Sequence, residues 1–327
     1  MYLHLIAVCR PRQDPLAARE LLPIAAAPPS SSIDRNLRQV CQTVRLSKTE
    51  ATTTMRKPVT IALLLIVPLF LLGSAGVSQA LTLYDDFNAK PINSAKWSGS
   101  EGNFGLLAPN GETARKIASG QLRIDITTWG RTDSDTGNNG LQGSKLAVTN
   151  PTAITTFQVD VTVKSAKVVA CAANPTFSRA RALITGAFFN DGTSSGPGDR
   201  TGDIAANFQL HRDSINGDQI QANIIRCTNA SCSSTTQVTV VFTSIWVKGV
   251  ARTLNMQWDK PNKQFIFTLN PGGIQEQHIL TYTVSLTNPA VAPFIHLASQ
   301  NSAASCQSGP RTSAIMKALF DNVMVNP

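Results

Sequence analysis

Carboxylate side chains are the first candidates for chemistry in this chain of 327 residues. Glycoside hydrolysis needs two of them, an acid and a nucleophile or base, roughly 5 to 9 Å apart. Only three Glu follow residue 80, Glu101, Glu112 and Glu276, and none has an Asp or Glu within four positions. Because residues two and four apart share one face of a strand, no single strand offers such a pair built on Glu.

The Asp clusters lie in segments rich in Gly, at Asp133 and Asp135 and again at Asp199 and Asp203. Carboxylates in such segments commonly accept hydrogen bonds from turn amides. We therefore predict that these residues form turns rather than a catalytic centre.

Two further patterns resemble catalytic motifs but lack their context. Residues 192–196 match G-x-S-x-G, a motif that requires a strand before it and a helix after it, yet Pro197 follows. His211, His278 and His296 lie in or beside predicted strands, where a structural histidine is the simpler interpretation. A lyase could use Arg, His and Tyr, but no spacing selects them. The sequence predicts no catalytic residue.

Carbohydrate recognition combines an aromatic platform with planar polar groups, and one segment has that composition. Trp129 ends a predicted strand and leads into a polar loop. The alternative is that Trp129 caps the edge of the core. The glycan contacts expected in this segment are Trp129, Arg131, Asp133, Asp135, Asn138 and Asn139.

Four cysteines, Cys171, Cys227, Cys232 and Cys306, follow the N-terminal segment. Cys227 and Cys232 are spaced for a local disulfide across a hairpin tip, which leaves Cys171 to pair with Cys306. A zinc site is the alternative, but the spacing differs from known sites and no His lies nearby. We predict two disulfides.

The elements that position these residues are strands. Residues 157–163 alternate apolar and polar side chains, and residues 254–258 and 264–269 flank a turn as in a hairpin. About a dozen strands, no helix of three turns and no internal repeat predict an all-β antiparallel β-sandwich, a jelly roll, over residues 81–327.

Short motifs in this domain resemble the concanavalin A-like lectin/glucanase superfamily. They are the opening residues 83–87 with Trp97, the strand from residue 120, the Trp258 hairpin and the closing residues 320–325. The resemblance implies adjacent N- and C-terminal strands, and a structural calcium at Asp321 as in laminarinase-like members. The Glu-Asp-Glu strand of the family's glucanases is absent. The resemblance supports the fold more than any function.

The N-terminal residues read as an export signal. Residues 55–57 are a basic start, residues 59–73 are apolar and residues 74–80 are small, so we predict a signal peptide over 55–80, cleaved after Ala80. Residues 1–54 have no sustained period and indicate a start codon assigned too far upstream. An uncleaved membrane anchor is the alternative.

Charge excludes one class of partner. Residues 1–80 hold nine Lys or Arg and four Asp or Glu, and the rest holds 20 and 16 without runs. A nucleic-acid partner is not expected, nor is a membrane once the leader is removed. We predict a secreted or periplasmic non-catalytic binding or structural module that engages a glycan. The alternatives are a divergent glycoside hydrolase or polysaccharide lyase, and an adhesin without a sugar ligand.

Overall fold

The computed structural model describes residues 80–106, 110–190, 199–283 and 294–326, which contain sixteen strands and no α-helix. The nine-stranded sheet has the order β14 (Glu276–Thr281), β13 (Gln264–Leu269), β12 (Ala251–Asp259), β7 (Thr156–Val169), β16 (Ser313–Val325), β5 (Gln121–Trp129), β4 (Gly111–Ala118) and β3 (Gly102–Leu106), with β1 (Thr82–Asp85) beside β16. The seven-stranded sheet has the order β11 (Thr235–Val241), β10 (Gly217–Cys227), β9 (Asp203–Asp213), β8 (Arg179–Asn190), β15 (His296–Ser302), β6 (Gln142–Val148) and β2 (Trp97–Ser98).

Alternation of side chains explains the strands. In β5, Leu122, Ile124 and Ile126 are buried, while Arg123 and Asp125 between them point outward. Each such strand leaves one apolar face, and two sheets bury these faces against each other. All pairings between the described strands are antiparallel, so the predicted all-β sandwich is confirmed.

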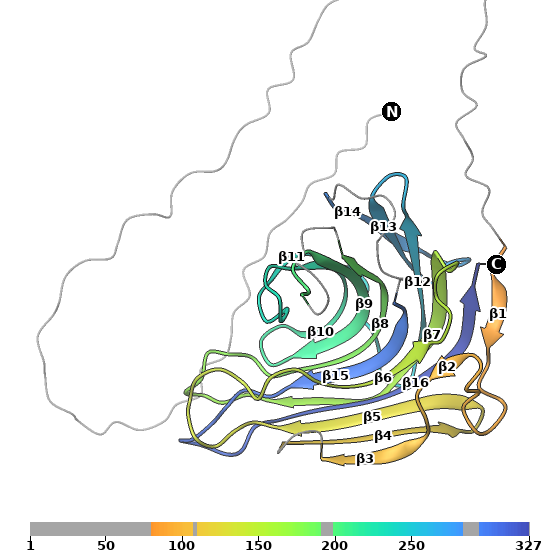
Figure 1. The fold of residues 1–327 in the computed structure, drawn as a ribbon. Coiled ribbons are helices and arrows are strands. Elements are labelled where there is room, and N and C mark those ends of the chain that lie inside the picture. The colour runs from red at the N-terminus through yellow and green to blue at the C-terminus, as the bar shows by residue number, and fades with distance from the viewer. Residues whose placement is uncertain (1–79, 107–109, 191–198, 284–293, 327) are drawn as a thin grey trace, which may run out of the picture. The chain divides into compact units, whose positions relative to one another are not determined.

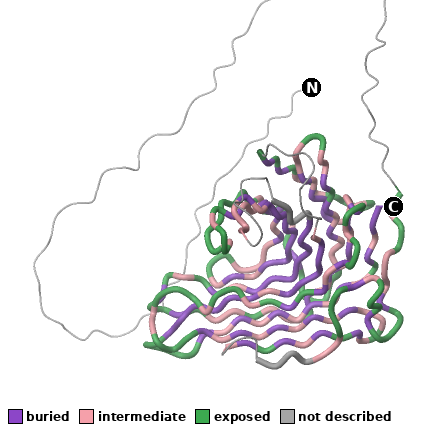
Figure 2. Tube along the Cα trace, viewed as in Figure 1, coloured by how far each residue is buried: buried purple, intermediate pink, exposed green. Residues whose placement is uncertain are grey.

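The core lies between the two sheets (Figure 2). Phe208 from the seven-stranded sheet contacts Phe267 from the other, with ring centroids 5.6 Å apart. Trp97, Trp246 and Trp258 are at most 4% exposed. These three tryptophans therefore belong to the core.

The seven-stranded sheet arcs inside the nine-stranded one, so its face away from the core is concave (Figure 1). β1 pairs with β16, with Thr82 opposite Val325, which confirms the expected adjacency of the first and last strands of the domain. The arc brings β8, β9, β10 and β15 side by side around the concave side.

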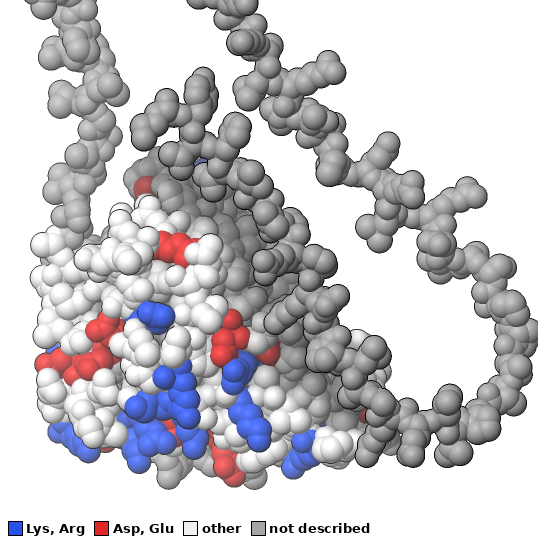
Figure 3. All heavy atoms as spheres, turned by 180° about the vertical axis from the view of Figure 1, so that it is seen from behind, with Lys and Arg blue, Asp and Glu red and all other residues white. Residues whose placement is uncertain are grey.

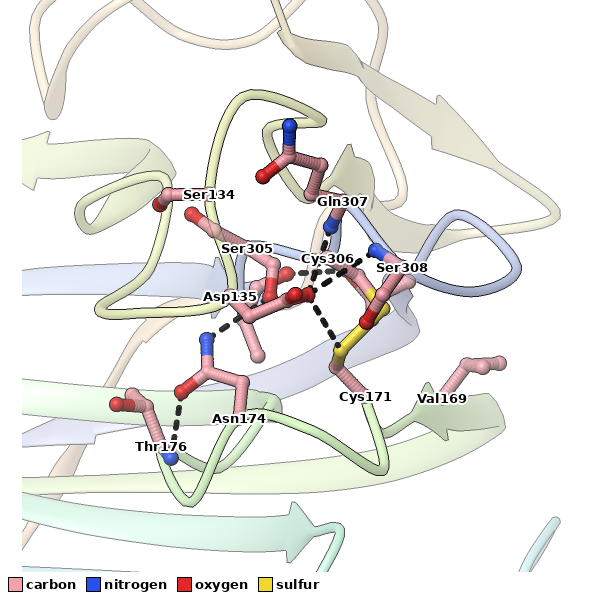
Figure 4. The surroundings of a disulfide bond; sticks show 12 residues. Ser134, Asp135, Val169, Cys171, Asn174, Thr176, Ser305, Cys306, Gln307 and Ser308 are labelled. Carbon is pink, nitrogen blue, oxygen red and sulfur yellow. Dashed lines mark hydrogen bonds between the residues drawn. A yellow bond between two sulfur atoms is a disulfide. The ribbon is translucent and has the colours of Figure 1, made fainter.

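Both predicted disulfides are present. Cys171 pairs with Cys306 and Cys227 with Cys232, at Cα–Cα distances of 5.5 and 4.8 Å. The first joins the segment after β7 to the segment after β15 (Figure 4).

Several expectations fall outside the described residues. They are the leader over 1–54, all but the last residue of the signal peptide over 55–80 and the G-x-S-x-G match at 192–196, and they stay predictions. Within the described part of the chain, no helix is long and apolar enough to cross a membrane.

Candidate functional site

The loop after β5 carries the glycan contacts predicted from the sequence. The Trp129 ring is half-buried on the outer side of the nine-stranded sheet, with the Arg311 guanidinium 5.6 Å from its centroid. Arg131 and Asp133 form an exposed ion pair with each other. Their charges are therefore already matched within the loop.

Other polar residues of this loop fasten it to the end of the sandwich. Asn138 accepts a hydrogen bond from a backbone amide of its own turn (2.8 Å). Asn139 donates to the Trp129 carbonyl (3.0 Å) and accepts from the Ala303 amide (2.8 Å). Asp135 accepts from the Gln307 amide (2.8 Å), beside the disulfide (Figure 4). Binding of a sugar by this loop stays a prediction.

Among the described residues, one group brings three possible metal-ligand atoms together. Asp135, Cys171 and Cys306 have ligand atoms within 4.8 Å of one another. The two sulfur atoms are joined in a disulfide, so neither is a thiolate. This group therefore has no metal-binding thiol.

Asp321 lies in β16 opposite Asp160 of β7. Its carboxylate accepts hydrogen bonds from the Gln121 side chain (3.1 Å) and the Asn322 amide (2.8 Å). Asp160 accepts from Thr253 and from the Asn322 side chain (2.5 and 2.9 Å). Calcium takes about six to eight oxygen ligands, and these two carboxylates do not make up such a set. Calcium at Asp321 stays a prediction.

Glu276, one of the three Glu of the domain, has a structural role. It accepts hydrogen bonds from the backbone amides of Thr243 and Ser244 at 2.7 and 3.2 Å. Burial alone would raise the pKa of Glu276, but these bonds outweigh it and hold the pKa at about 2. An acid this strong is not a proton donor at neutral pH.

A different set of polar residues covers the concave side of the seven-stranded sheet. In β8, β9, β10 and β15 every second residue faces this side, because the alternate residues fill the core. Ala205, Leu183 and Ala298 interrupt it. Its polar members, which we name the concave polar face, are Arg179, Arg181, Thr185, Asp203, Asn207, Gln209, His211, Asp213, Gln219, Gln221, Asn223, His296, Gln300 and Ser302.

The strand register sets these side chains in rows, and hydrogen bonds run along the rows. Thr185 donates to Asn207 (2.6 Å), and Asn207 donates to Asn223 (2.9 Å). Each pair lies directly opposite in neighbouring strands. The amide orientations in this row are therefore fixed by their neighbours.

A second network crosses the middle of the face. Gln209 donates to Gln221 (2.9 Å), while the Arg181 guanidinium donates to Gln209 (3.3 Å) and to Gln300 (2.7 Å). Arg181 thus reaches strands on both sides of β8. Amide oxygens rather than carboxylates receive its hydrogen bonds.

Several buried polar atoms of this face have no hydrogen-bond partner. They are both ring nitrogens of His211 and of His296, the Nε atoms of Arg179 and Arg181, and the hydroxyl of Ser302. Buried polar atoms in native proteins are nearly always bonded to protein, water or ligand. Seven of the thirteen such atoms among the described residues lie on this face, and the other six lie elsewhere in the two sheets.

Burial sets the protonation states here. It lowers the pKa of His296 to about 3, with help from the Lys145 ammonium, and the pKa of His211 to about 4. It lowers the pKa of Arg181 to about 9, with repulsion from Arg179. At neutral pH the two imidazoles are therefore neutral and the guanidinium is charged.

Exposure rises from the centre of the face to its flanking strands. Gln209 is 2% exposed and His211 6%. Gln221 in β10 is half-buried, and Lys145 in β6 and Thr239 in β11 are exposed. The face therefore reaches solvent along its flanks.

Carboxylates are scarce on this face. Among the described residues, β9 contributes Asp203 at one end and Asp213 at the other, ten positions apart. Asp213 accepts hydrogen bonds from the Ile215 and Asn216 amides at 2.8 and 2.5 Å, so it holds the β9–β10 turn. At about 3.3 Å per residue the two are roughly 33 Å apart, too far for a glycosidase pair.

Some cations outside the concave polar face have acidic neighbours. On the outer side of the nine-stranded sheet, Arg123 pairs with Asp125, and Lys317 lies opposite Asp125. Seen from behind, Lys and Arg side chains gather in the lower half with Asp and Glu among them (Figure 3). On the concave polar face, Arg179 and Arg181 form no ion pair with a described carboxylate, although Asp213 lies opposite Arg179 in register.

No protein-family model matches this chain, and no curated protein matches it. A glycoside hydrolase family 16 endo-glucanase from Bacteroides ovatus is similar in structure, with 9% identity over 72% of this chain and 98% of that chain and a TM-score of 0.39. A glycoside hydrolase family protein from Mycobacterium thermorestibile has 13% identity, 73% and 97% coverage and a TM-score of 0.41. A winged bean acidic lectin has 10% identity, 76% and 98% coverage and a TM-score of 0.31.

These three structures are distant from this chain in sequence, at 9% to 13% identity. The fold assignment rests on the strand order, and no residue role is transferred from them.

The concave polar face was not predicted from the sequence. Asn207, Gln209 and His211 alternate with apolar residues, a pattern that equally describes a solvent-facing side. The one signal in the sequence is that these alternate positions carry amides, Arg and His in place of Lys and Glu.

Proposed function

We propose that the concave polar face binds a glycan without cleaving it. The observation that supports this most is the group of buried polar atoms without partners at His211, His296, Arg179, Arg181 and Ser302. A ligand with many hydroxyl groups would satisfy them. The unsatisfied atoms then have a function, and their cost in stability is offset on binding.

The chemistry of the side chains fits sugar hydroxyls. Each hydroxyl both donates and accepts, and an amide offers two donors and an acceptor in one plane. Asn207, Gln209 and Asn223 are held in place by bonds within their rows. Such preorganised groups lose little conformational entropy when a ligand binds.

An aromatic ring adjoins the same face. Phe294 precedes β15, with its ring edge-on to His296 at a centroid distance of 4.7 Å and the Lys145 ammonium 5.0 Å from its centroid. Aromatic rings next to planar polar groups are typical of ligand sites.

The export and disulfide assignments support the same proposal. Disulfides persist in oxidising compartments, and this domain contains two. We propose that the domain from Leu81 is secreted or periplasmic, a location in which it encounters glycans. Asn139 accepts a hydrogen bond from the Ala303 amide, next to Ser302 of the face, so we propose that this end of the loop, rather than the Trp129 ring, supplies further contacts.

Cleavage of the glycan is the second candidate function. The observation in its favour is His211, neutral at neutral pH and directly opposite the Arg181 guanidinium in register. A neutral imidazole can remove a proton, as a lyase requires. Against it, a base of pKa about 4 is weak, and no Tyr of the described residues belongs to this face.

The test is a glycan array probed with the purified protein and with Asn207→Ala. We expect wild-type binding to a restricted set of glycans and a loss of about 5- to 30-fold for Asn207→Ala, from one or two lost hydrogen bonds. Asn255→Ala is the matched control, because Asn255 bonds Gln158 at 3.3 Å on the other sheet. No glycan bound, or equal losses in both variants, contradicts the proposal.

The enzyme alternative needs its own measurement. Bound oligosaccharides are incubated with the protein and their masses compared before and after. We expect unchanged masses, and fragments that disappear in His211→Gln would establish cleavage.

A further inference from the structure

Two guanidinium groups lie next to each other on the concave polar face. Arg179 and Arg181 are two positions apart on β8 and point to the same side. Arg181 is 8% exposed and Arg179 is half-buried. Each has a buried Nε atom without a hydrogen-bond partner.

Their counter-charge is incomplete. No carboxylate of the described residues forms an ion pair with either group. Asp213, opposite Arg179 in register, attracts it, but the Asp213 oxygens bond the turn after β9. His211 is neutral at neutral pH, and Lys145 adds positive charge to the same side.

Arg115 shows how this protein buries a guanidinium for structure alone. It is 7% exposed, and its donors go to the backbone carbonyls of Ser100 (2.7 Å) and Lys145. That single cation has acceptors of fixed position, and no second guanidinium lies beside it on the same face of β4. The Arg179 and Arg181 pair differs, because two guanidinium groups share one face and the Nε atom of each has no acceptor.

Burying a charge without a counter-ion is costly, and two like charges side by side add to the cost. An anion that binds between them removes both penalties. We propose that the ligand of the concave polar face is an acidic glycan whose anionic group, a uronate carboxylate or a sulfate ester, binds between Arg179 and Arg181. This inference rests on the proposed glycan-binding function and names its ligand class.

The geometry favours a bound oxyanion. Guanidinium groups present their N–H donors in a planar fork that matches carboxylate and sulfate oxygens. Gln209 and Gln300 hold the Arg181 plane from both sides through its terminal nitrogens. The Nε donor of Arg181 has no hydrogen-bond partner. The same holds for the Nε donor of Arg179, which forms no ion pair with a described carboxylate.

The experiment is calorimetric titration with three oligosaccharides of equal length, one a polyuronate, one sulfated and one neutral. We expect an acidic ligand to bind at least about 10-fold more tightly than the neutral one, and the difference to shrink as salt increases. Preference for the uronate or for the sulfated ligand identifies the anion.

Arg181→Gln should weaken acidic binding by about 10- to 100-fold and remove the preference over the neutral ligand. Arg181→Lys should restore part of the affinity, since it keeps the charge but not the fork. Arg123→Gln, on the outer sheet, should change nothing. Arg179→Gln, at the end of β8, repeats the test if Arg181→Gln does not fold by circular dichroism.

Two failures are distinguishable. Equal affinity for neutral and acidic ligands, unchanged in Arg181→Gln and Arg179→Gln, overturns the acidic ligand and leaves glycan binding intact. No binding of any of the three, together with a blank array, overturns the proposed function itself.

Discussion

β9 has two faces that differ in chemistry but hardly in burial. Ile204, Ala206, Phe208 and Leu210 point into the core and are at most 1% exposed. Gln209, on the opposite side, is 2% exposed. Alternation therefore does not separate inside from outside in this strand. It separates an apolar interior from a polar surface that is crowded but only partly bonded.

The comparison shows where stability and function are divided. The core side has its contacts complete within the fold. The concave polar face leaves atoms of His211, His296 and Arg181 unbonded, at a cost that folding alone does not recover. Strained or unsatisfied polar groups that persist in a fold commonly mark binding sites.

The largest expected effect is on the free energy of unfolding, when two adjacent residues of β9 that point to opposite faces are substituted. Phe208→Ala should lower the free energy of unfolding by about 3 to 5 kcal/mol, because it leaves a cavity against Phe242 and Phe267. Gln209→Ala should cost about 1 to 3 kcal/mol, since it removes hydrogen bonds but few packing contacts. Urea unfolding of both variants checks the order.

Equal losses in the two variants would mean that the polar side is packed as a second core. A larger loss for Gln209→Ala would contradict the division between the faces outright.

Acid should weaken the fold through the concave face. The folded pKa values of His296 and His211, about 3 and about 4, lie below the ordinary value near 6.5, so between these limits the unfolded chain binds more protons. Stability is then complete above pH 6.5 and is lost as pH falls. From pH 6.5 to 5 each histidine should cost about 2 kcal/mol.

Urea unfolding at several pH values measures this slope. His296→Gln should flatten it, because this histidine would no longer bind a proton on unfolding. A slope that is the same in wild type and in His296→Gln would show that His296 is not buried in its neutral form.

Much of the fold could be predicted from the sequence, and the reason is local. In β7, Phe157, Val159 and Val161 give a clear period of two. Cys227 and Cys232 are close in sequence, which predicts a local disulfide. β4, from Gly111 to Ala118, was not predicted because Thr113 and Arg115 occupy inward positions and hide its alternation. β6 is likewise short of large apolar residues.

The candidate site could not be predicted, because it depends on register. Arg181 bonds Gln300, 119 positions away, and Asn207 lies opposite Asn223 only after β9 and β10 have paired. A single strand does not show whether its polar side meets water or other strands. Nor does it show that two guanidinium groups lack counter-ions.

The smallest expected effect is that of Trp129→Ala, which tests the loop against the concave polar face. Its ring lies on the outer side of the nine-stranded sheet, beside Arg311 and away from Arg181. We expect glycan affinity to change by less than about 3-fold, because a few contacting residues carry most of the binding energy and this ring would not touch the ligand. Calorimetric titration with the glycan that the wild-type protein binds measures this affinity, and thermal melts show whether the variant is folded. If Trp129→Ala abolishes binding in a folded protein while Arg181→Gln does not, the site predicted from the sequence is the correct one. The concave polar face would then be a buried structural layer, and its unbonded atoms would need water rather than a glycan.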